Sequence, residues 1–330
     1  MSSDDNKMSA EDRLIARFFA PLATHPGALG LSDDAAFVKP PPGCDLVLKT
    51  DAIVGSVHFF ADDPPGQLAR KALRVNLSDL AAKGARPLGF LLSLVLPADI
   101  TDSWLSSFAA GLQADAETYG CPLFGGDTDR TPGPLAISIA MFGAVPTGTM
   151  VLRAGAKPGD RIMVTGTIGD AALGVQLRRG AAWKLPIEAR EHLLSRYLLP
   201  QPRNALAEAI REQASAAMDV SDGLAGDLTK LCAVSQVAAT VDVDKVPLSD
   251  AARAVLATDA NLIETVLAGG DDYEVLCTVP PGRVDGFRAA AAKAEVALTD
   301  IGVITPGGGA VFLGVDQKPL HLPRLSYSHF

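Results

Sequence analysis

The residues of this chain that could do chemistry are aspartates beside apolar segments, glycines or small residues. The aspartates that share this setting are Asp33, Asp34, Asp51, Asp79, Asp127, Asp219 and Asp222. Two carboxylates about 4 Å apart repel by roughly 4 kcal/mol at an effective dielectric constant of about 20, so cations must offset their charge. Oxygen ligands without a His or Cys cluster favour Mg²⁺ or Mn²⁺ over zinc. Because Mg²⁺ held in this way commonly also binds phosphates, the aspartates indicate chemistry on phosphorylated substrates.

Glycine motifs accompany several of these acids. The pairs at 125–126 and 269–270 each precede an acid, and we expect turns in which positive φ and close backbone approach make room for phosphate. The motif Ser-Asp-Gly-Leu at 221–224 opens a predicted helix. The glycine turn at 166–169 lacks the ending of a P-loop and the GxGxxG spacing, so we interpret it as a tight strand-to-helix turn. No GxSxG or HExxH motif points to another chemistry.

The element that must position Asp79 is a predicted helix within the stretch 68–87. Leucines recur in it at helical spacing and predict a stripe that faces the core, formed by Leu73, Leu77 and Leu80. Asp79 lies on the neighbouring stripe among alanines, which allows other structure to approach closely. Gly84, followed by a proline at 87, ends the helix.

Strands and helices are predicted to alternate along the rest of the chain, which favours an α/β or α+β fold with sheets covered by helices. Asp51 is expected at the end of the strand predicted at 46–50.

The chain is expected to form two domains. A stretch rich in Gly, Pro and Thr at 146–159 marks a boundary, and 330 residues suit two domains, 1–148 and 149–330. Helices are predicted near 14–19 and at 102–119, 204–213, 224–235, 250–257 and 284–294, and strands at 35–38, 46–50, 88–96, 135–145, 161–165, 216–220, 238–243 and 275–280, with two more near the C-terminus.

Composition narrows the class of protein. A formal net charge of −9, no basic run and 5% aromatic residues argue against a nucleic-acid surface. The longest apolar runs, such as 88–97, are too short to span a membrane, and the polar N-terminus has no signal-peptide core. Four scattered cysteines favour free thiols in a reducing compartment. We therefore expect a cytoplasmic globular protein that binds neither nucleic acid nor membrane.

Several motifs, in order along nearly the whole chain, carry a resemblance to a known family. They are SDDAAF, KTDAIVGSVHF, KALRVNLSDLAAKGARP, LFGGDT, LRAGAKPGD, VTGTIGD, DVSDGL and GGDDYE. In this combination the sequence resembles the thiamine-monophosphate kinases of the AIR-synthase-like (PurM-like) superfamily. The resemblance implies a two-domain PurM-like fold, in which residues 1–148 bind ATP and Mg²⁺ and form the core of a homodimer. It also implies ATP-dependent phosphorylation of thiamine monophosphate to thiamine diphosphate, with several Mg²⁺ ions, at active sites formed by both domains.

The resemblance assigns roles to individual residues. The implied metal ligands are Asp34, Thr50, Asp51, Asp79, Asp127, Asp219 and Asp222. The implied ATP contacts are Gly126, Asp127, Arg153 and Ser221, and the implied substrate contacts are His58, Asp271 and Tyr327. No residue is assigned as a catalytic acid or base, because the phosphate of the acceptor has a second pKa near 6 and is largely a dianion at neutral pH. Direct in-line transfer then depends on positioning and on electrostatics.

The sequence departs from the family pattern at a few positions. Asp271 stands where the family usually has Glu, and Lys49 replaces the usual Ser or Thr before Thr-Asp. Ser32 replaces a glycine before the aspartate pair. Where relatives carry an aromatic residue against the thiamine ring, Arg324 occupies the nearest position and Tyr327 is the closest aromatic.

Other functions within and outside this superfamily compete with the kinase. Selenophosphate synthesis calls for a reactive Cys near the N-terminus and hydrogenase maturation for a C-terminal Cys, and the chain has neither. An enzyme of the aminoimidazole ribonucleotide synthase type is the nearest alternative. A non-catalytic nucleotide-binding regulator is an alternative of a different class.

Overall fold

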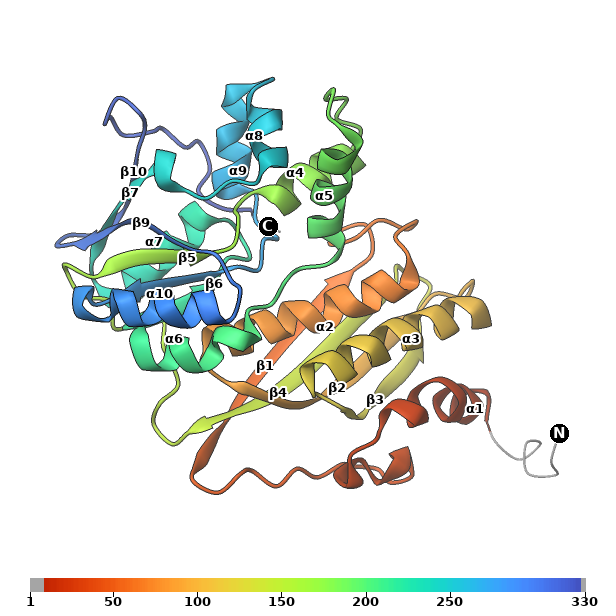
Figure 1. Ribbon diagram of the computed structural model, residues 1–330. Helices are drawn as coiled ribbons and strands as arrows, with labels where there is room; N and C mark the ends of the chain where they lie inside the picture. Colours follow the sequence, from red (N-terminus) through yellow and green to blue (C-terminus); the bar gives the residue numbers. More distant parts are fainter. Residues whose placement is uncertain (1–8, 328–330) are drawn as a thin grey trace. The chain divides into compact units, whose positions relative to one another are not determined.

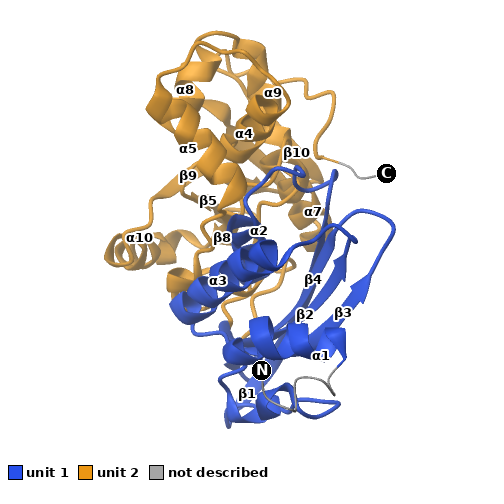
Figure 2. Cartoon of the chain, turned by 90° about the vertical axis from the view of Figure 1, so that its right-hand side faces the viewer, with its two compact units in different colours: residues 1–77, 86–148 blue, residues 78–85, 149–330 orange. Residues whose placement is uncertain are grey.

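The structure is a computed structural model that describes residues 9–327. The chain divides into two compact units (Figure 2), of which unit 1 comprises residues 1–77 and 86–148 and unit 2 comprises residues 78–85 and 149–330. In the part that the structure describes, no helix has the length and apolar character needed to cross a membrane.

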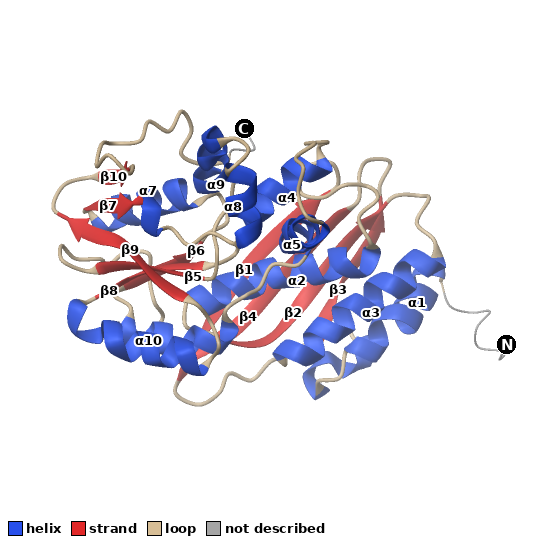
Figure 3. Cartoon of the chain, turned by 45° about the horizontal axis from the view of Figure 1, so that its top comes forward, coloured by secondary structure: helices blue, strands red, loops and turns tan. Residues whose placement is uncertain are grey.

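Unit 1 is built on a mixed four-stranded sheet in the order β1-β4-β2-β3, with β2 and β3 parallel and the other pairs antiparallel. Helices α2 and α3 lie along one face of this sheet (Figure 3). The opposite face leaves Leu46, Leu48 and Leu91 exposed. The elements are β1 Cys44–Val54, α2 Pro65–Ala82, β2 Arg86–Leu96, α3 Asp102–Tyr119, β3 Leu123–Arg130 and β4 Ala136–Pro146. Residues 78–82 at the end of α2 count with unit 2.

Both long helices end at the predicted glycine and α3 also begins where its local sequence predicts, whereas α2 begins at Pro65, three residues before the predicted 68. Thr101 caps α3 by accepting a hydrogen bond from Trp104 N at 3.2 Å, and Gly120 ends the helix in the left-handed conformation. Gly84 takes φ +70° after α2, while Ala85 N donates to Leu80 O at 2.9 Å. Together with the bond from Gly84 N to Ala81 O at 3.0 Å, this bond closes a Schellman-type end that satisfies the last carbonyls of the helix.

The N-terminal segment of unit 1 corrects one prediction. The predicted helix near 14–19 is present as short helical turns, but residues 35–38 form no strand. Phe37 N donates to Gly27 O at 2.9 Å, and the prolines at 40–42 have no N–H with which to continue a ladder. The helical segments are α1 Ala10–Leu14, η1 Ile15–Phe19, η2 Ala20–Leu22 and η3 Pro26–Leu31.

Two further predictions in unit 1 are wrong because strand pairing extends farther than the local sequence indicates. Asp51 lies inside β1 rather than at its end, since β4 continues the antiparallel pairing as far as Val54. The Gly125-Gly126 pair lies in β3 and forms no turn. Its expected close approach is nevertheless present, because a Cβ on Gly126 would lie 1.7 Å from Leu92 O of the neighbouring strand.

Unit 2 is built on a six-stranded sheet in the order β10-β7-β9-β5-β8-β6, in which β10 and β7 are parallel and the other pairs antiparallel. Its strands are β5 Arg161–Thr165, β6 Ala216–Asp219, β7 Ala238–Asp242, β8 Val275–Val279, β9 Leu298–Thr305 and β10 Gly309–Leu313. Its α-helices are α4 Asp170–Arg178, α5 Ile187–Leu198, α6 Ala207–Gln213, α7 Leu224–Ser235, α8 Asp250–Leu256, α9 Ile263–Ala268 and α10 Val284–Lys293.

Two hydrophobic cores form in unit 2 because successive side chains of a strand point to opposite faces of the sheet. Ile162 and Val164 of β5 enter one core with α4, α5, α7 and α9, whereas Met163 between them enters another with α6 and α10. Figure 1 shows these helix groups on the two faces of the sheet. The mixed α/β fold class is therefore confirmed.

Candidate active site

Asp79 is the partly exposed residue in a stretch of α2 that is otherwise buried from 71 to 82. The end of this helix is held within unit 2. Ser78 Oγ donates to Tyr273 O at 3.4 Å, and Lys83 Nζ donates to Ala217 O at 2.6 Å. The carboxylate of Asp79 is thus presented from a rigid support.

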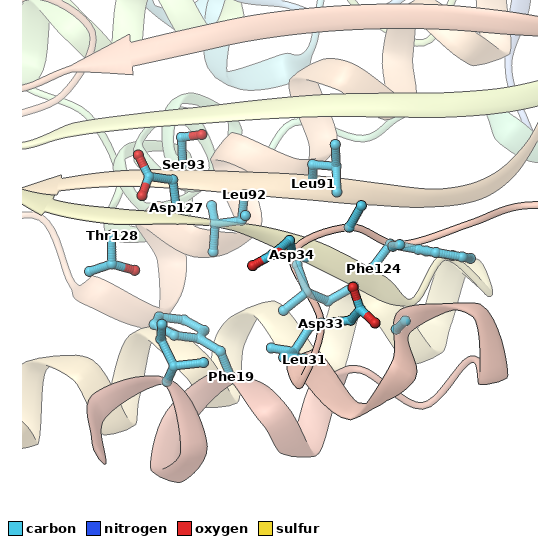
Figure 4. A pocket seen from close by; sticks show the side chains of 17 residues that line it. Phe19, Leu31, Asp33, Asp34, Leu91, Leu92, Ser93, Phe124, Asp127 and Thr128 are labelled. Carbon is cyan, nitrogen blue, oxygen red and sulfur yellow. The ribbon is translucent and has the colours of Figure 1, made fainter. Parts of the chain in front are cut away.

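A cavity of about 600 Å³ in unit 1 gathers other predicted acids, and we call it the acidic pocket. Figure 4 shows Asp34 extending into it, with Asp127 beside Ser93 on the neighbouring strand. One part of the lining is polar and formed by Asp33, Asp34, Ser93, Asp127 and Thr128. The rest is apolar or glycine and includes Ile15, Phe19, Leu31, Leu91, Leu92, Phe124, Gly125 and Gly126.

The donor set of the acidic pocket fits a hard divalent cation. Its polar groups are carboxylate and hydroxyl oxygens, and the described lining contains no Lys, Arg, His or Cys. Within residues 9–327, no three His, Cys, Asp or Glu side chains are grouped closely enough to hold a metal ion by themselves. Mg²⁺ is commonly bound by one or two carboxylates together with substrate phosphates, and Asp34 and Asp127 could supply those carboxylates.

The predicted ligands on β1 lie on different faces of the sheet. Thr50 and Asp51 are consecutive in the strand, so their side chains point in opposite directions. One ion therefore cannot be bound by both side chains. Lys49 shares the face of Asp51, and its Nζ lies 3.2 Å from Asp51 Oδ1.

His58 follows β1 in a tight turn that fixes its ring. Its Nδ1 accepts a hydrogen bond from Val54 N at 3.0 Å, and its backbone carbonyl accepts from Lys71 Nζ at 3.4 Å. With Nδ1 acting as an acceptor, the neutral ring carries its proton on Nε2. His58 can therefore present an N–H donor to an anionic or carbonyl oxygen.

In unit 2, residues 220–221, where the Ser-Asp-Gly-Leu motif begins, pair with the segment at 270–274 along the backbone. Asp271 N donates to Ser221 O at 2.7 Å, and Tyr273 N donates to Val220 O at 2.8 Å. Gly270 has φ +75°, and a Cβ there would lie 2.4 Å from Ser221 O. The predicted turn before Asp271 is therefore present, and it brings this residue beside the Ser-Asp-Gly-Leu motif.

The buried side chain of Asp227 holds the backbone of this motif by hydrogen bonds, a role that the local sequence does not indicate. Its Oδ2 accepts from Ser221 N at 3.0 Å and from Asp222 N at 2.9 Å. Burial raises the pKa of Asp227, although the hydrogen bond from Lys230 acts to lower it. Lys230 Nζ also lies 2.5 Å from Asp222 Oδ2.

A second buried network anchors the far end of the 270–274 segment. Glu274 is fully buried and accepts hydrogen bonds from Arg196, Arg203 and Thr165. The neighbouring Asp272 accepts from Gly169 N, and burial raises its pKa well above the ordinary value. Sequence reasoning did not find these partners, because the arginines lie about 70 to 80 residues away along the chain.

The described end of the chain also contacts the Ser-Asp-Gly-Leu region. Tyr327 N donates to Asp222 O at 2.9 Å, and the tail crosses α7 where a Cβ on Gly226 would lie 2.4 Å from Ser326 Cβ. Arg153 is exposed, and its backbone carbonyl accepts from Ser235 Oγ at 3.0 Å.

Comparisons with known proteins show the family of this chain. The AIR synthase related protein N-terminal domain matches residues 32–145, and the corresponding C-terminal domain matches residues 157–314. The thiamine-monophosphate kinase of Caulobacter vibrioides is 43% identical over 96% of this chain and 89% of that protein. The chain belongs to the thiamine-monophosphate kinase family.

Solved structures of this family share the fold along nearly the whole chain. The thiamine-monophosphate kinase of Stenotrophomonas maltophilia matches with a TM-score of 0.83 and 38% identity, covering 95% of this chain and 98% of that one. A structure of AaThiL complexed with AMPPCP and TMP matches with a TM-score of 0.77 and 30% identity, covering 97% and 94%.

Within each unit, the structure brings some of the residues predicted from the family pattern together. Unit 1 brings Asp34, Gly126 and Asp127 together in the acidic pocket, whose lining includes neither Asp51 nor His58. Unit 2 brings Ser221, Asp222, Asp271 and Tyr327 together through the backbone contacts given above, at the end of the strand that carries Asp219. Within residues 9–327, the exposed side chain of Arg153 belongs to neither group.

Proposed function

We propose that this chain catalyses the ATP-dependent phosphorylation of thiamine monophosphate to thiamine diphosphate. The observation that carries the proposal is the acidic pocket, in a chain that matches thiamine-monophosphate kinases over almost its whole length. The AaThiL structure complexed with AMPPCP and TMP supports an ATP analogue and the phosphorylated acceptor as ligands of this family.

The proposed reaction is direct in-line transfer of the γ-phosphoryl group to the phosphate of the acceptor. That phosphate is largely a dianion at neutral pH, so the chain needs no general base to activate it. Its task is to hold two anions close together and in line. The carboxylates would hold Mg²⁺, which would supply positive charge between the two anions.

The individual roles complete the proposal. Metal binding falls to Asp34, Thr50, Asp51, Asp79, Asp127, Asp219 and Asp222. ATP is contacted by Gly126, Asp127, Arg153 and Ser221, and the exposed guanidinium of Arg153 suits phosphate oxygens. Thiamine monophosphate is contacted by His58, Asp271 and Tyr327. The N–H donor of His58 and the fixed turn at Asp271 support these assignments.

We also propose a homodimer formed through the domain of residues 1–148. The face of its sheet opposite α2 and α3 exposes Leu46 and Leu48 outside the acidic pocket, and Leu48 is 75% exposed. An apolar sheet face of this kind is commonly covered by a partner. A cytoplasmic location is part of the proposal, and the free state of all four cysteines supports a reducing compartment.

The proposal is tested by incubating the purified protein with ATP, Mg²⁺ and thiamine monophosphate. Thiamine diphosphate and ADP should form in equal amounts. Asp79→Asn and Asp222→Asn should abolish turnover without unfolding the protein, because both side chains are partly exposed. Asp285→Asn, at a fully exposed aspartate of α10, is the matched control and should keep wild-type activity.

Other outcomes would contradict the proposal. Near-normal turnover in Asp79→Asn or Asp222→Asn would refute the assigned metal roles. Release of inorganic phosphate without thiamine diphosphate would indicate another activity of the superfamily, and no turnover at all would favour a nucleotide-binding regulator.

A further inference from the structure

Lys230 of α7 holds the carboxylate that is proposed to bind metal in unit 2. Its Nζ lies 2.5 Å from Asp222 Oδ2 and 3.0 Å from Asp227 Oδ1. The Lys230 side chain is 43% exposed, and that of Asp222 is 37% exposed. The ammonium group therefore neutralises Asp222 at an accessible position, where a dissolved cation could also arrive.

The two carboxylates beside Lys230 differ in what they can do. Asp227 is buried, and one of its oxygens is already engaged by the backbone N–H groups of Ser221 and Asp222. Asp222 is partly exposed, and its backbone is held by the same bonds and by Tyr327 N. Lys230 thus has a permanent partner in Asp227 and an exchangeable partner in Asp222.

We propose that Lys230 is an internal cation that competes with a divalent metal ion for Asp222, an inference that rests on the proposed function. An ammonium group and a metal ion repel each other when they bind the same carboxylate. The four-carbon stem of lysine is flexible, so Nζ can leave Asp222 while it keeps its bond to Asp227. Lys230 therefore weakens metal binding in the absence of nucleotide and keeps Asp222 neutralised until the metal arrives.

A second proposed ligand shows the same arrangement on a different element. Lys49 Nζ lies 3.2 Å from Asp51 Oδ1 on β1, and both side chains are partly exposed. Asp34 and Asp127 differ from Asp222 and Asp51 in this respect. No lysine or arginine is among the described residues that line the acidic pocket. The structure thus separates carboxylates that carry an internal cation from carboxylates that do not.

The test measures metal binding directly and does not depend on turnover. The full chain, as wild type and as Lys230→Met, is titrated with Mn²⁺ alone, and free Mn²⁺ is followed by electron paramagnetic resonance. Methionine keeps the length of the stem and removes the charge. Because removal of one positive charge next to the site relieves repulsion, Lys230→Met should bind Mn²⁺ about tenfold more tightly. The gain should disappear in the double variant Lys230→Met with Asp222→Asn.

The matched control is Lys245→Met. Lys245 forms a similar ion pair, with Nζ 3.1 Å from Asp242 Oδ2, at a residue to which no metal role is assigned. It should bind Mn²⁺ like the wild type. If Lys230→Met does not fold, Lys230→Gln keeps hydrogen-bonding capacity without the charge and should show the same gain.

Unchanged or weaker Mn²⁺ binding in a folded Lys230 variant would overturn the proposal, because it would mean that Lys230 only positions Asp222. A gain that survives Asp222→Asn would also overturn it. Failure of the kinase assay leaves this measurement intact, so the two proposals can fail separately.

Discussion

Replacement of Glu274 should strongly destabilise unit 2. Arg196 Nη2 donates to Glu274 Oε1 at 2.7 Å, while Arg203 donates to both carboxylate oxygens. Thr165 Oγ1 donates to Oε2 at 2.7 Å. The carboxylate is fully buried, and the side chains of Arg196 and Arg203 are only 10% and 18% exposed. Glu274→Ala would leave two guanidinium groups without their counter-charge in a place that water barely reaches.

The size of the effect follows from this burial. Removal of one partner from a buried ion pair costs about 3–5 kcal/mol, because the remaining charge is left uncompensated. Proteins are stable by only about 5–15 kcal/mol, so the loss is a large part of the total. The effect should reach the proposed site as well, since Glu274 O accepts from Val220 N at 2.8 Å beside the Ser-Asp-Gly-Leu motif.

The assay is urea unfolding of the full chain followed by circular dichroism, with Glu208→Ala as the control. Glu208 also pairs with an arginine, Arg211, but at 3.7 Å and with its side chain 77% exposed. Such surface pairs contribute about 0–1 kcal/mol, so the control should unfold almost like the wild type. A loss below about 1 kcal/mol in Glu274→Ala, or equal losses in both variants, would refute the argument from burial.

Two other substitutions test the neighbouring contacts. Burial raises the pKa of Asp272, so the folded state binds its proton more tightly than the unfolded state, and wild-type stability falls as the pH rises above the unfolded pKa of about 3.9. Asp272→Asn should therefore gain stability over the wild type as the pH rises from 4 to 8 in thermal unfolding, and a constant difference would contradict this assignment. Gly226→Ala should displace the tail, because the new Cβ would collide with Ser326. Trypsin should then cleave faster after the exposed Arg324, as followed by mass spectrometry, and cleavage at the wild-type rate would show that the tail does not depend on this contact.

The sequence alone determined the features that depend on a few neighbouring residues. The Thr101 cap and the glycine ends at Gly84 and Gly120 are local, because the side chain or the left-handed backbone that ends a helix lies within one turn of it. The turn at Gly270 could be predicted for the same reason. The order of the motifs along the chain also identified the family, because members of one family keep the same residue types at the same places in their common site.

Only the tertiary structure decided which segments pair and which charges meet. The Gly125-Gly126 pair became part of a strand because β2 lies beside it, and Asp51 fell inside β1 because β4 extends the ladder. The partners of Glu274 come from distant parts of the chain, so no local spacing could predict them. Lys230 is three residues from Asp227, a spacing that indicates a helical ion pair, but its contact with Asp222 depends on the turn that precedes α7. Local sequence fixes backbone geometry over a few residues, whereas the charge environment of a carboxylate depends on everything that folding brings within a few ångströms of it.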